Sequence, residues 1–261
     1  MRSALTLARR GLGNVWPNPA VGCVLVREDL NNRVVGRGWT QHGGSPHAET
    51  EALARAGDLA RGATAYVTLE PCSHIGRTDP CADALIEAGI SRTVVAAIDP
   101  DPRVSGRGIA RLRKAGIATD VGLLGPEAKA LNSGFWRRQQ SARPIVTLKI
   151  ATTADGFVAS RNGDSQWITG SEARQHSHFL RAQHDAILTG IGTVEADNPM
   201  LTCRLPGLSH LSPIRVVMDS KHRLGAETSL AVSADIVPVW RIGAAGTDFA
   251  VDSSAVVDLR V

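Results

Sequence analysis

The sequence predicts an α/β protein with two domains, and two observations lead to this class. Short apolar runs typical of strands alternate with runs of helical periodicity, and this alternation occurs twice along the chain. A polar stretch that ends in a proline, residues 137–144, separates the two series. The chain has 261 residues, of which 43% are hydrophobic, so it is long enough to bury a core. We therefore predict domains at residues 1–143 and 144–261.

The first series predicts helices and strands that share one sheet. It starts with a helix, continues with two strands joined by a polar turn, and then alternates between helix and strand. The expected helices span residues 5–10, 47–56, 81–88 and 108–115, and the expected strands span residues 20–26, 34–38, 66–69 and 93–98. Strands separated by helices indicate an α/β sandwich.

The second series predicts another α/β domain. The expected strands span residues 145–151, 186–189, 214–218 and 236–240, and the expected helix spans residues 171–182. No internal repeat and no low-complexity tract interrupts either series.

Charge and composition narrow the class of protein. The formal net charge is +4, but the 29 Lys and Arg residues are spread among 25 Asp and Glu residues. This spread argues against a nucleic-acid partner and permits a small anionic ligand. No apolar run is long enough to cross a bilayer, and the first residues lack the layout of a signal peptide, so we expect a cytoplasmic protein with no membrane partner.

A candidate catalytic zinc site consists of His47, Cys72 and Cys81, with Glu49 as its acid–base group. One imidazole and two thiolates leave the fourth tetrahedral position of a zinc ion open for water, whose pKa zinc lowers toward about 7. Glu49 can take the proton of that water and pass it to the leaving ammonia. The pattern H-x-E followed by P-C is typical of nucleobase deaminases, although residues 73–80 widen the usual C-x-x-C spacing.

The same residues permit a second interpretation of this site, and two further cysteines lie elsewhere in the chain. A structural zinc ion or unrelated core cysteines would give the same residue types without catalysis. Cys23 lies in an apolar strand and Cys203 has no neighbouring His or Cys, so both are expected to be small buried side chains.

Taken together, the motifs resemble the bifunctional riboflavin-biosynthesis deaminase/reductase family, whose long insert between the two cysteines matches residues 73–80. The resemblance implies a cytidine-deaminase-like α/β/α domain followed by a dihydrofolate-reductase-like α/β domain. It implies zinc-dependent deamination of a diaminopyrimidinone ribosylamino 5′-phosphate, then NADPH-dependent reduction of the ribosyl group. The motifs are Pro17-Asn18-Pro19-Ala20-Val21-Gly22, His47-Ala48-Glu49, Pro71-Cys72-Ser73-His74 through Cys81, Asp99-Pro100-Asp101-Pro102, Gly106-Arg107-Gly108, Thr147-Leu148-Lys149, Asp155-Gly156, Trp167-Ile168-Thr169-Gly170, Gly190-Ile191-Gly192-Thr193 and Ala196-Asp197-Asn198-Pro199.

The resemblance also implies roles for individual residues. His74 and Arg77 additionally suit a ribose phosphate by their chemistry, since Arg offers planar paired donors, while a solvated loop is the alternative. The implied substrate residues are Asn18, His74, Arg77 and Asp101 in the first domain and Lys149, Ser165, Arg181, Leu201 and Arg204 in the second. The implied NADPH contacts are Ala151, Trp167, Thr169, Thr193, Asp197 and Ser220.

Three residues depart from the commonest pattern of the family, and all three concern substrate contacts. Asp79 replaces a frequent proline, Asp101 replaces a frequent asparagine, and Thr40 replaces a frequent histidine, with His42 nearby. The metal ligands follow the pattern.

Several alternatives stay open in the second domain. Viewed alone, residues 190–193 could be a tight turn and Trp167 a core aromatic. The histidines at 176, 178 and 184 are expected on a helix surface, since none has metal-ligand spacing. The chain stops before a later strand and glycine-rich segment of the family, so we expect an incomplete reductase domain.

At the level of function, the main alternative is a deaminase with a non-functional reductase remnant. A tRNA or free-base deaminase, and a non-catalytic remnant that dimerises, are further alternatives. We expect a homo-oligomer, either a dimer or a tetramer.

Overall fold

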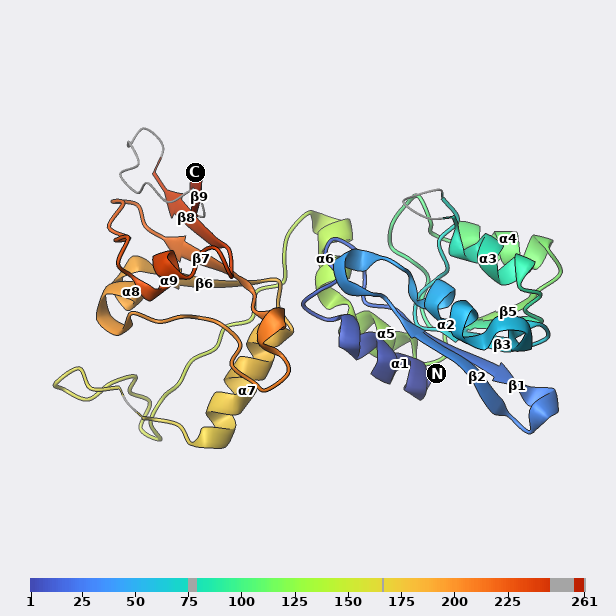
Figure 1. Ribbon diagram of the computed structural model, residues 1–261, viewed down its shortest axis with the longest axis horizontal. Coiled ribbons are helices and arrows are strands. Elements are labelled where there is room, and N and C mark those ends of the chain that lie inside the picture. The colour runs from blue at the N-terminus through green and yellow to red at the C-terminus, as the bar shows by residue number, and fades with distance from the viewer. Residues whose placement is uncertain (75–78, 166, 245–255, 261) are drawn as a thin grey trace. The chain divides into compact units, whose positions relative to one another are not determined.

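The structure is a computed structural model that describes every residue except 75–78, 166, 245–255 and 261. It divides into two compact units, Met1–Thr147 and Leu148–Val261, each with its own sheet (Figure 1). Among the described residues, no helix is both long enough and apolar enough to cross a membrane.

The sheet of the first unit has the strand order β2-β1-β3-β4-β5. Strand β1 (Gly22–Arg27) pairs antiparallel with β2 (Arg33–Trp39) and with β3 (Thr64–Val67). Strands β3, β4 (Arg92–Val95) and β5 (Ala118–Val121) are parallel, so helices must connect them.

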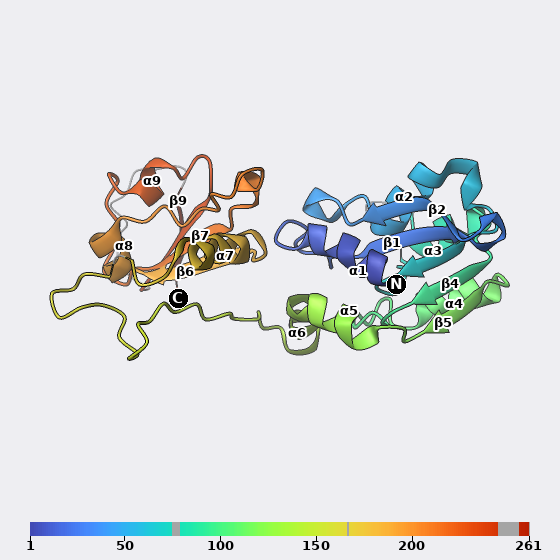
Figure 2. The same ribbon diagram turned by 90° about the horizontal axis from the view of Figure 1, so that it is seen from below.

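Helices cover both faces of this sheet. They are α1 (Arg2–Ala8), α2 (Ala48–Ala56), α3 (Cys81–Glu87), α4 (Arg107–Lys114), α5 (Gly125–Leu131) and α6 (Ser133–Ser141). In β1, Cys23 and Leu25 pack into the core beneath α2, whereas Val24 packs with residues of α1. This alternation is the period of two that a strand imposes, and Figure 2 shows β1 and β2 between the two helices.

Two glycines let these helices approach the sheet closely. A Cβ at Gly38 would lie 2.0 Å from the carbonyl oxygen of Ala48, and a Cβ at Gly22 would lie 2.0 Å from that of Ala4. The alanines of α2 complete the close fit, because they add little volume between helix and sheet. The start of α2, where the first candidate ligand lies, is therefore held against β2.

The second unit has a parallel sheet in the order β6-β7-β8-β9. The strands are β6 (Ala186–Gly190), β7 (Ile214–Met218), β8 (Val239–Gly243) and β9 (Val256–Arg260), and the helices are α7 (Ser171–Ala182), α8 (Ile191–Asp197) and α9 (Ser229–Val232). Its core includes Val194, Val217 and Leu230. Arg215 is fully buried in β7, and its guanidinium donates to the carbonyl oxygens of Met200 and Ser233.

Most expected elements are present, with shifts of up to three residues at their ends. The helix at 171–182 and the strand at 214–218 have the predicted bounds. The expected strand at 236–240 forms three residues later, as β8. The periodicity of the sequence does not predict β5, β9, α5, α6, α8 and α9, which the structure contains.

One expected strand is wrong. Residues 145–151 form no strand, and Val146 and Leu148 are 85% and 79% exposed. An apolar run becomes a strand only if a neighbouring strand exchanges backbone hydrogen bonds with it, and in the described part of the chain neither sheet includes residues 145–151. The polar stretch at 137–144, predicted as the domain boundary, is helical in its first part. Helix α6 continues through it to Ser141, because several residues of this stretch are good helix formers.

Candidate active site

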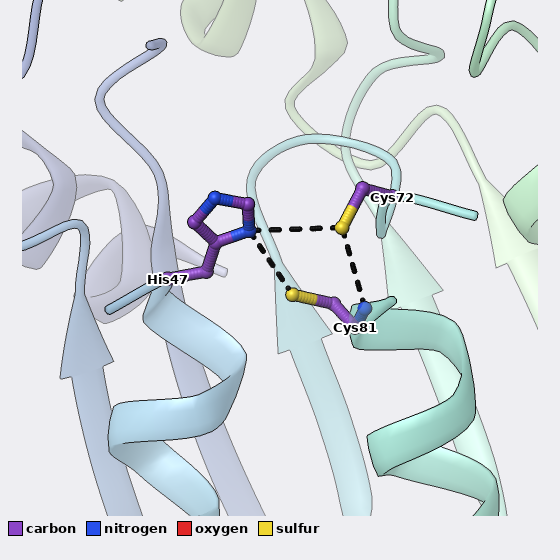
Figure 3. Close-up of side chains that lie close together, drawn as sticks. All are labelled: His47, Cys72 and Cys81. Atoms are coloured by element: carbon purple, nitrogen blue, oxygen red, sulfur yellow. Dashed lines mark hydrogen bonds between the residues drawn. The ribbon is translucent and has the colours of Figure 1, made fainter. Parts of the chain in front are cut away.

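Three candidate metal ligands converge from three different elements of the first unit (Figure 3). His47 directly precedes α2, Cys72 lies in the loop after β3, and Cys81 is the first residue of α3. The Nδ1 atom of His47 lies 3.2 Å from the Sγ of Cys81 and 3.6 Å from the Sγ of Cys72. All three ligand atoms lie within 4.8 Å of one another.

This geometry fits a zinc ion. Tetrahedral zinc with ordinary Zn–N and Zn–S bonds places an imidazole nitrogen about 3.6 Å from a thiolate sulfur. The backbone N–H of Cys81 donates to the Sγ of Cys72 at 3.3 Å, so the amide at the start of α3 already supports a thiolate. Hydrogen bonds from Cys81 and His47 lower the pKa of Cys72, whereas the hydrogen bond with Cys72 and burial raise the pKa of Cys81, so Cys72 is the thiolate of this pair.

Glu49 lies in the first turn of α2, two residues after His47, and is 4% exposed. Burial raises the pKa of its carboxyl group to about 7, although the charge of His47 acts in the opposite direction. A carboxyl group that titrates near neutral pH can both accept and return a proton. Cys23, expected to be a small buried side chain, lies in the core, as does Cys203 in the second unit.

Two of the candidate ligands, His47 and Cys72, line a cavity of about 370 Å³. Asn18, His74 and Asp101, all predicted substrate residues, line it together with His47, Glu49 and Cys72. Asn18 is held by a 2.8 Å hydrogen bond from its Nδ2 to the carbonyl oxygen of Gly44. Arg77, the fourth predicted substrate residue of this domain, lies outside the described residues.

The cavity has further polar residues that the sequence analysis did not select: Glu70, Asp99, Arg103, Arg138 and Gln139. Glu70 is 3% exposed, and its carboxylate accepts hydrogen bonds from the backbone N–H groups of Asp99, Gly106 and Ile109. These hydrogen bonds connect α4 and the 99–106 loop to the segment between β3 and Cys72. In the sequence, the position of Glu70 directly before Pro71-Cys72 is the one feature that could have indicated a role at the site.

Asp99 is 7% exposed, and burial raises its pKa to about 6. Its Oδ1 accepts the backbone N–H of Asp101 at 2.8 Å.

The three departures from the family pattern have different places in the structure. Thr40 is buried and lines the same cavity, but its hydroxyl is engaged within the protein, since it donates to the carbonyl oxygen of Pro19 and accepts the N–H of Val21. Asp79 is exposed. Asp101 faces the cavity in an ion pair with Arg103.

In the second unit, the structure brings together three of the predicted substrate residues. Arg181 of α7 donates to the carbonyl oxygen of Thr202 at 3.0 Å, between the buried Leu201 and the exposed Arg204. Burial and the nearby charge of Arg204 lower the pKa of Arg181. His178 is only half-buried, and its Nδ1 lies 3.3 Å from the backbone nitrogen of Arg204.

The remaining candidates of this unit are not gathered into one site. Lys149 is exposed in the 145–151 segment, and Ser165 and Trp167 are exposed in the stretch before α7, where Trp167 stacks against Arg174 at 4.5 Å. The others lie at dispersed positions: Ala151 and Thr169 are half-buried, and Thr193, Asp197 and Ser220 are exposed. Residues 190–193 lie where β6 ends and α8 begins.

Each of the two units matches the model of a known protein family. The family model described as "Cytidine and deoxycytidylate deaminase zinc-binding region" matches residues 1–97, and that described as "RibD C-terminal domain" matches residues 144–253. The chain therefore combines a cytidine-deaminase-like domain that has a zinc-binding region with an α/β domain of the RibD C-terminal type.

Relatives that carry both domains define the family. The riboflavin biosynthesis protein RibD of Escherichia coli is 48% identical over 86% of this chain and 63% of its own length. That of Haemophilus influenzae is 43% identical over 95% of this chain and 68% of its own. The chain belongs to the riboflavin biosynthesis protein RibD family. It covers less than two thirds of the length of the E. coli relative.

Solved structures of the same family are similar to this chain over nearly its whole length. A diaminohydroxyphosphoribosylaminopyrimidine deaminase/5-amino-6-(5-phosphoribosylamino)uracil reductase from Thermotoga maritima has a TM-score of 0.89 and 39% identity, covering 99% of this chain and 72% of that one. RibD of Acinetobacter baumannii has a TM-score of 0.88 and 41% identity, covering 100% and 72%.

Proposed function

We propose that the first unit, with the expected bounds 1–143, is a zinc-dependent deaminase of a phosphorylated diaminopyrimidine. The observation that carries the proposal is the convergence of His47, Cys72 and Cys81. Of these, His47 and Cys72 line, together with the buried Glu49, a cavity large enough for a nucleotide-sized ligand. A purely structural zinc site has no need of a buried acid that titrates near neutral pH.

The residues of the chain have separable tasks in this proposal. His47, Cys72 and Cys81 would hold the zinc ion, which when bound supplies a polarised water. Glu49, whose pKa burial raises to about 7, can accept the first proton of the attacking water and give it to the ring nitrogen; it can then move the second proton of that water to the amino group, which leaves as ammonia when its C–N bond breaks. Asn18 and Asp101 lie on the cavity wall, where they can orient the pyrimidine.

The substrate we propose is the diaminopyrimidinone ribosylamino 5′-phosphate, and the deaminase activity named for the T. maritima relative supports it. The test is ammonia release by the zinc-loaded chain from this compound, from cytidine and from tRNA. Release from the first compound alone supports the proposal. Release from cytidine or tRNA alone would favour the free-base or tRNA alternative, and release from none of the three would favour a non-catalytic zinc protein.

We also propose that residues 144–261 bind NADPH and reduce the deaminated product. The match to the RibD C-terminal domain and the cluster of Arg181, Leu201 and Arg204 support this assignment. Because Lys149 and Trp167 lie exposed outside this cluster, we expect reduction to be much slower than deamination. Loss of nicotinamide absorbance after addition of the deaminated product and NADPH measures the rate, and a rate equal to that of ammonia release would contradict the expectation.

We also propose that the protein is cytoplasmic and that it forms a homo-oligomer, either a dimer or a tetramer. All four cysteines are free, which suits a reducing compartment. Exposed apolar side chains such as Trp16 and Leu188, 67% and 64% exposed, suit contacts between copies. Analytical ultracentrifugation distinguishes a dimer, a tetramer and a monomer.

A further inference from the structure

Segment 17–20 carries Asn18 on the cavity wall, yet it has few backbone groups with which the sheet could hold it. Its first three residues line the cavity, and β1 begins two residues after it. Because residues 17 and 19 are prolines, only Asn18 and Ala20 have a backbone N–H. The N–H of Asn18 donates to the carbonyl oxygen of Val15 within the same loop. The position of the segment must therefore be fixed by groups from elsewhere in the fold.

Asn132, at the junction of α5 and α6, supplies two of these groups. Its Oδ1 accepts the backbone N–H of Ala20 at 2.8 Å, and its Nδ2 donates to the carbonyl oxygen of the same residue at 2.8 Å. Asn132 is 5% exposed and Ala20 is 1% exposed, so water cannot take the place of either hydrogen bond. One buried amide thus satisfies both backbone groups at the end of the segment.

Arg138 of α6 holds the other end of segment 17–20. Its Nη2 donates to the carbonyl oxygen of Pro17 at 2.8 Å, and its guanidinium lies 5.5 Å from the ring centre of Phe135, one turn earlier in the helix. Phe135, Arg138 and Gln139 share one face of α6, and all three line the cavity. Helix α6 therefore holds both ends of the segment and also forms part of the cavity wall.

Asn18 lies between these two points of attachment. Its side chain is directed by the hydrogen bond from Nδ2 to the carbonyl oxygen of Gly44, so a shift of the backbone at either end would move it relative to His47 and Cys72. Helix α6 itself lies between the residue ranges that the two family models match, 1–97 and 144–253. Its contacts nevertheless reach the wall of the cavity.

We propose that α6 belongs to the deaminase site, with Asn132 and Arg138 as positioning residues that hold segment 17–20 so that Asn18 can orient the pyrimidine. The inference rests on the proposed deamination, because it concerns the same cavity. Both residues act through the backbone of the segment rather than through contact with reacting atoms. A small displacement of an orienting group is sufficient to lower the rate of a reaction that depends on alignment.

The test asks whether α6 acts through Asn18. In zinc-loaded chains, Arg138→Met should lower kcat/KM for the diaminopyrimidinone ribosylamino 5′-phosphate about 10-fold, the loss expected for one hydrogen bond from a charged group. In the Asn18→Ala background the same change should lower kcat/KM by less than about twofold, because the side chain that is positioned is absent. A general loss of folded protein would reduce activity by the same factor in both backgrounds, so equal effects would overturn the inference.

Two controls separate this role from the charge of the arginine. Arg137→Met removes the same charge from the exposed neighbour of Arg138, which is not among the described residues that line the cavity, and kcat/KM should stay within about twofold. The loss in Arg138→Met should be similar for the phosphorylated compound and its dephosphorylated form. A loss confined to the phosphorylated compound would show direct contact with the phosphate and would overturn the positioning role of Arg138.

Asn132→Ala removes the buried attachment and should have the larger effect. Both backbone groups of Ala20 lose their partner, so we expect kcat/KM to fall about 100-fold while one zinc per chain is retained. Loss of zinc in parallel with activity would contradict a role confined to segment 17–20. Because this variant also loses stability, Arg138→Met, which keeps the Asn132 hydrogen bonds, is the decisive variant.

Hydrogen exchange of the Ala20 amide keeps this inference distinct from the proposed reaction. In chains that contain isotope-labelled alanine, Arg138→Met should speed exchange of this amide about fivefold or more relative to that of Ala65 in β3, and Arg137→Met should not. Faster exchange without ammonia release by any chain would refute the deamination and retain the role of α6 in holding the segment. Normal ammonia release with unchanged exchange in Arg138→Met would overturn the role of α6 alone.

Discussion

Replacing Gly108 with alanine should damage the metal site from a distance. Gly108 is the second residue of α4, and a Cβ there would lie 2.0 Å from the carbonyl oxygen of Pro71, the residue before the ligand Cys72. Cβ–oxygen contacts below about 3.0 Å are essentially never seen, so helix and loop must separate by about 1 Å. The same movement would stretch the hydrogen bonds from Gly106 and Ile109 to Glu70.

The magnitude follows from two opposing effects. Forcing one extra carbon into a packed contact costs about 1–3 kcal/mol, occasionally more. Alanine in a helix gains up to about 1 kcal/mol over glycine. We therefore expect a net loss of about 1–2 kcal/mol and a fall in Tm of about 3–6 °C for a unit of this size.

The assay is a thermal melt together with zinc retention during dialysis against a chelator. Gly134→Ala is the matched control, because Gly134 is also the second residue of a helix, α6, and a Cβ there meets nothing within 4 Å. That variant should keep its zinc and have an unchanged or slightly higher Tm. If Gly108→Ala behaved like Gly134→Ala in both measurements, the claim that this contact positions Cys72 would be refuted.

Three further predictions concern the site itself. Glu49→Gln should retain zinc but release ammonia at least about 100-fold more slowly, because an amide cannot transfer the proton; near-normal release would show that another group does so. Cys72→Ser and Cys81→Ser should each weaken zinc binding strongly, and one zinc per chain by atomic absorption in the double variant would place the metal elsewhere. Asp99→Asn should stabilise the protein at pH 7 by about 1–2 kcal/mol after allowance for solvent screening, since burial raises the pKa of Asp99 to about 6. The folded state retains a proton between about pH 4 and 6 that the unfolded chain has lost, so wild-type stability falls as pH rises through this window. Urea melts of both proteins should therefore converge below about pH 4, and a constant difference at all pH values would contradict this origin.

The local pattern of residues was sufficient to predict the fold class and the metal ligands. Periodicity is a property of neighbouring residues, so the helix at 171–182 and the strand at 214–218 could be predicted with their bounds. His47, Cys72 and Cys81 could be predicted as candidate ligands because zinc chemistry restricts the residue types, and the structure brings these three together. The glutamate before Pro71 was visible in the sequence, but its role as an acceptor for three backbone N–H groups was not.

Features that depend on contacts between distant segments could be established only from the tertiary structure. Residues 145–151 have the composition of a strand, yet they remain exposed because strand formation needs a partner that local sequence cannot specify. Thr40 could have been a substrate contact by its position in the pattern, but its hydroxyl is used between Pro19 and Val21. Burial beside the cavity raises the pKa of Glu49, and Asp101 forms its ion pair with Arg103 at the same cavity. Residue type alone could not predict either feature, because desolvation and charge pairing depend on the three-dimensional surroundings.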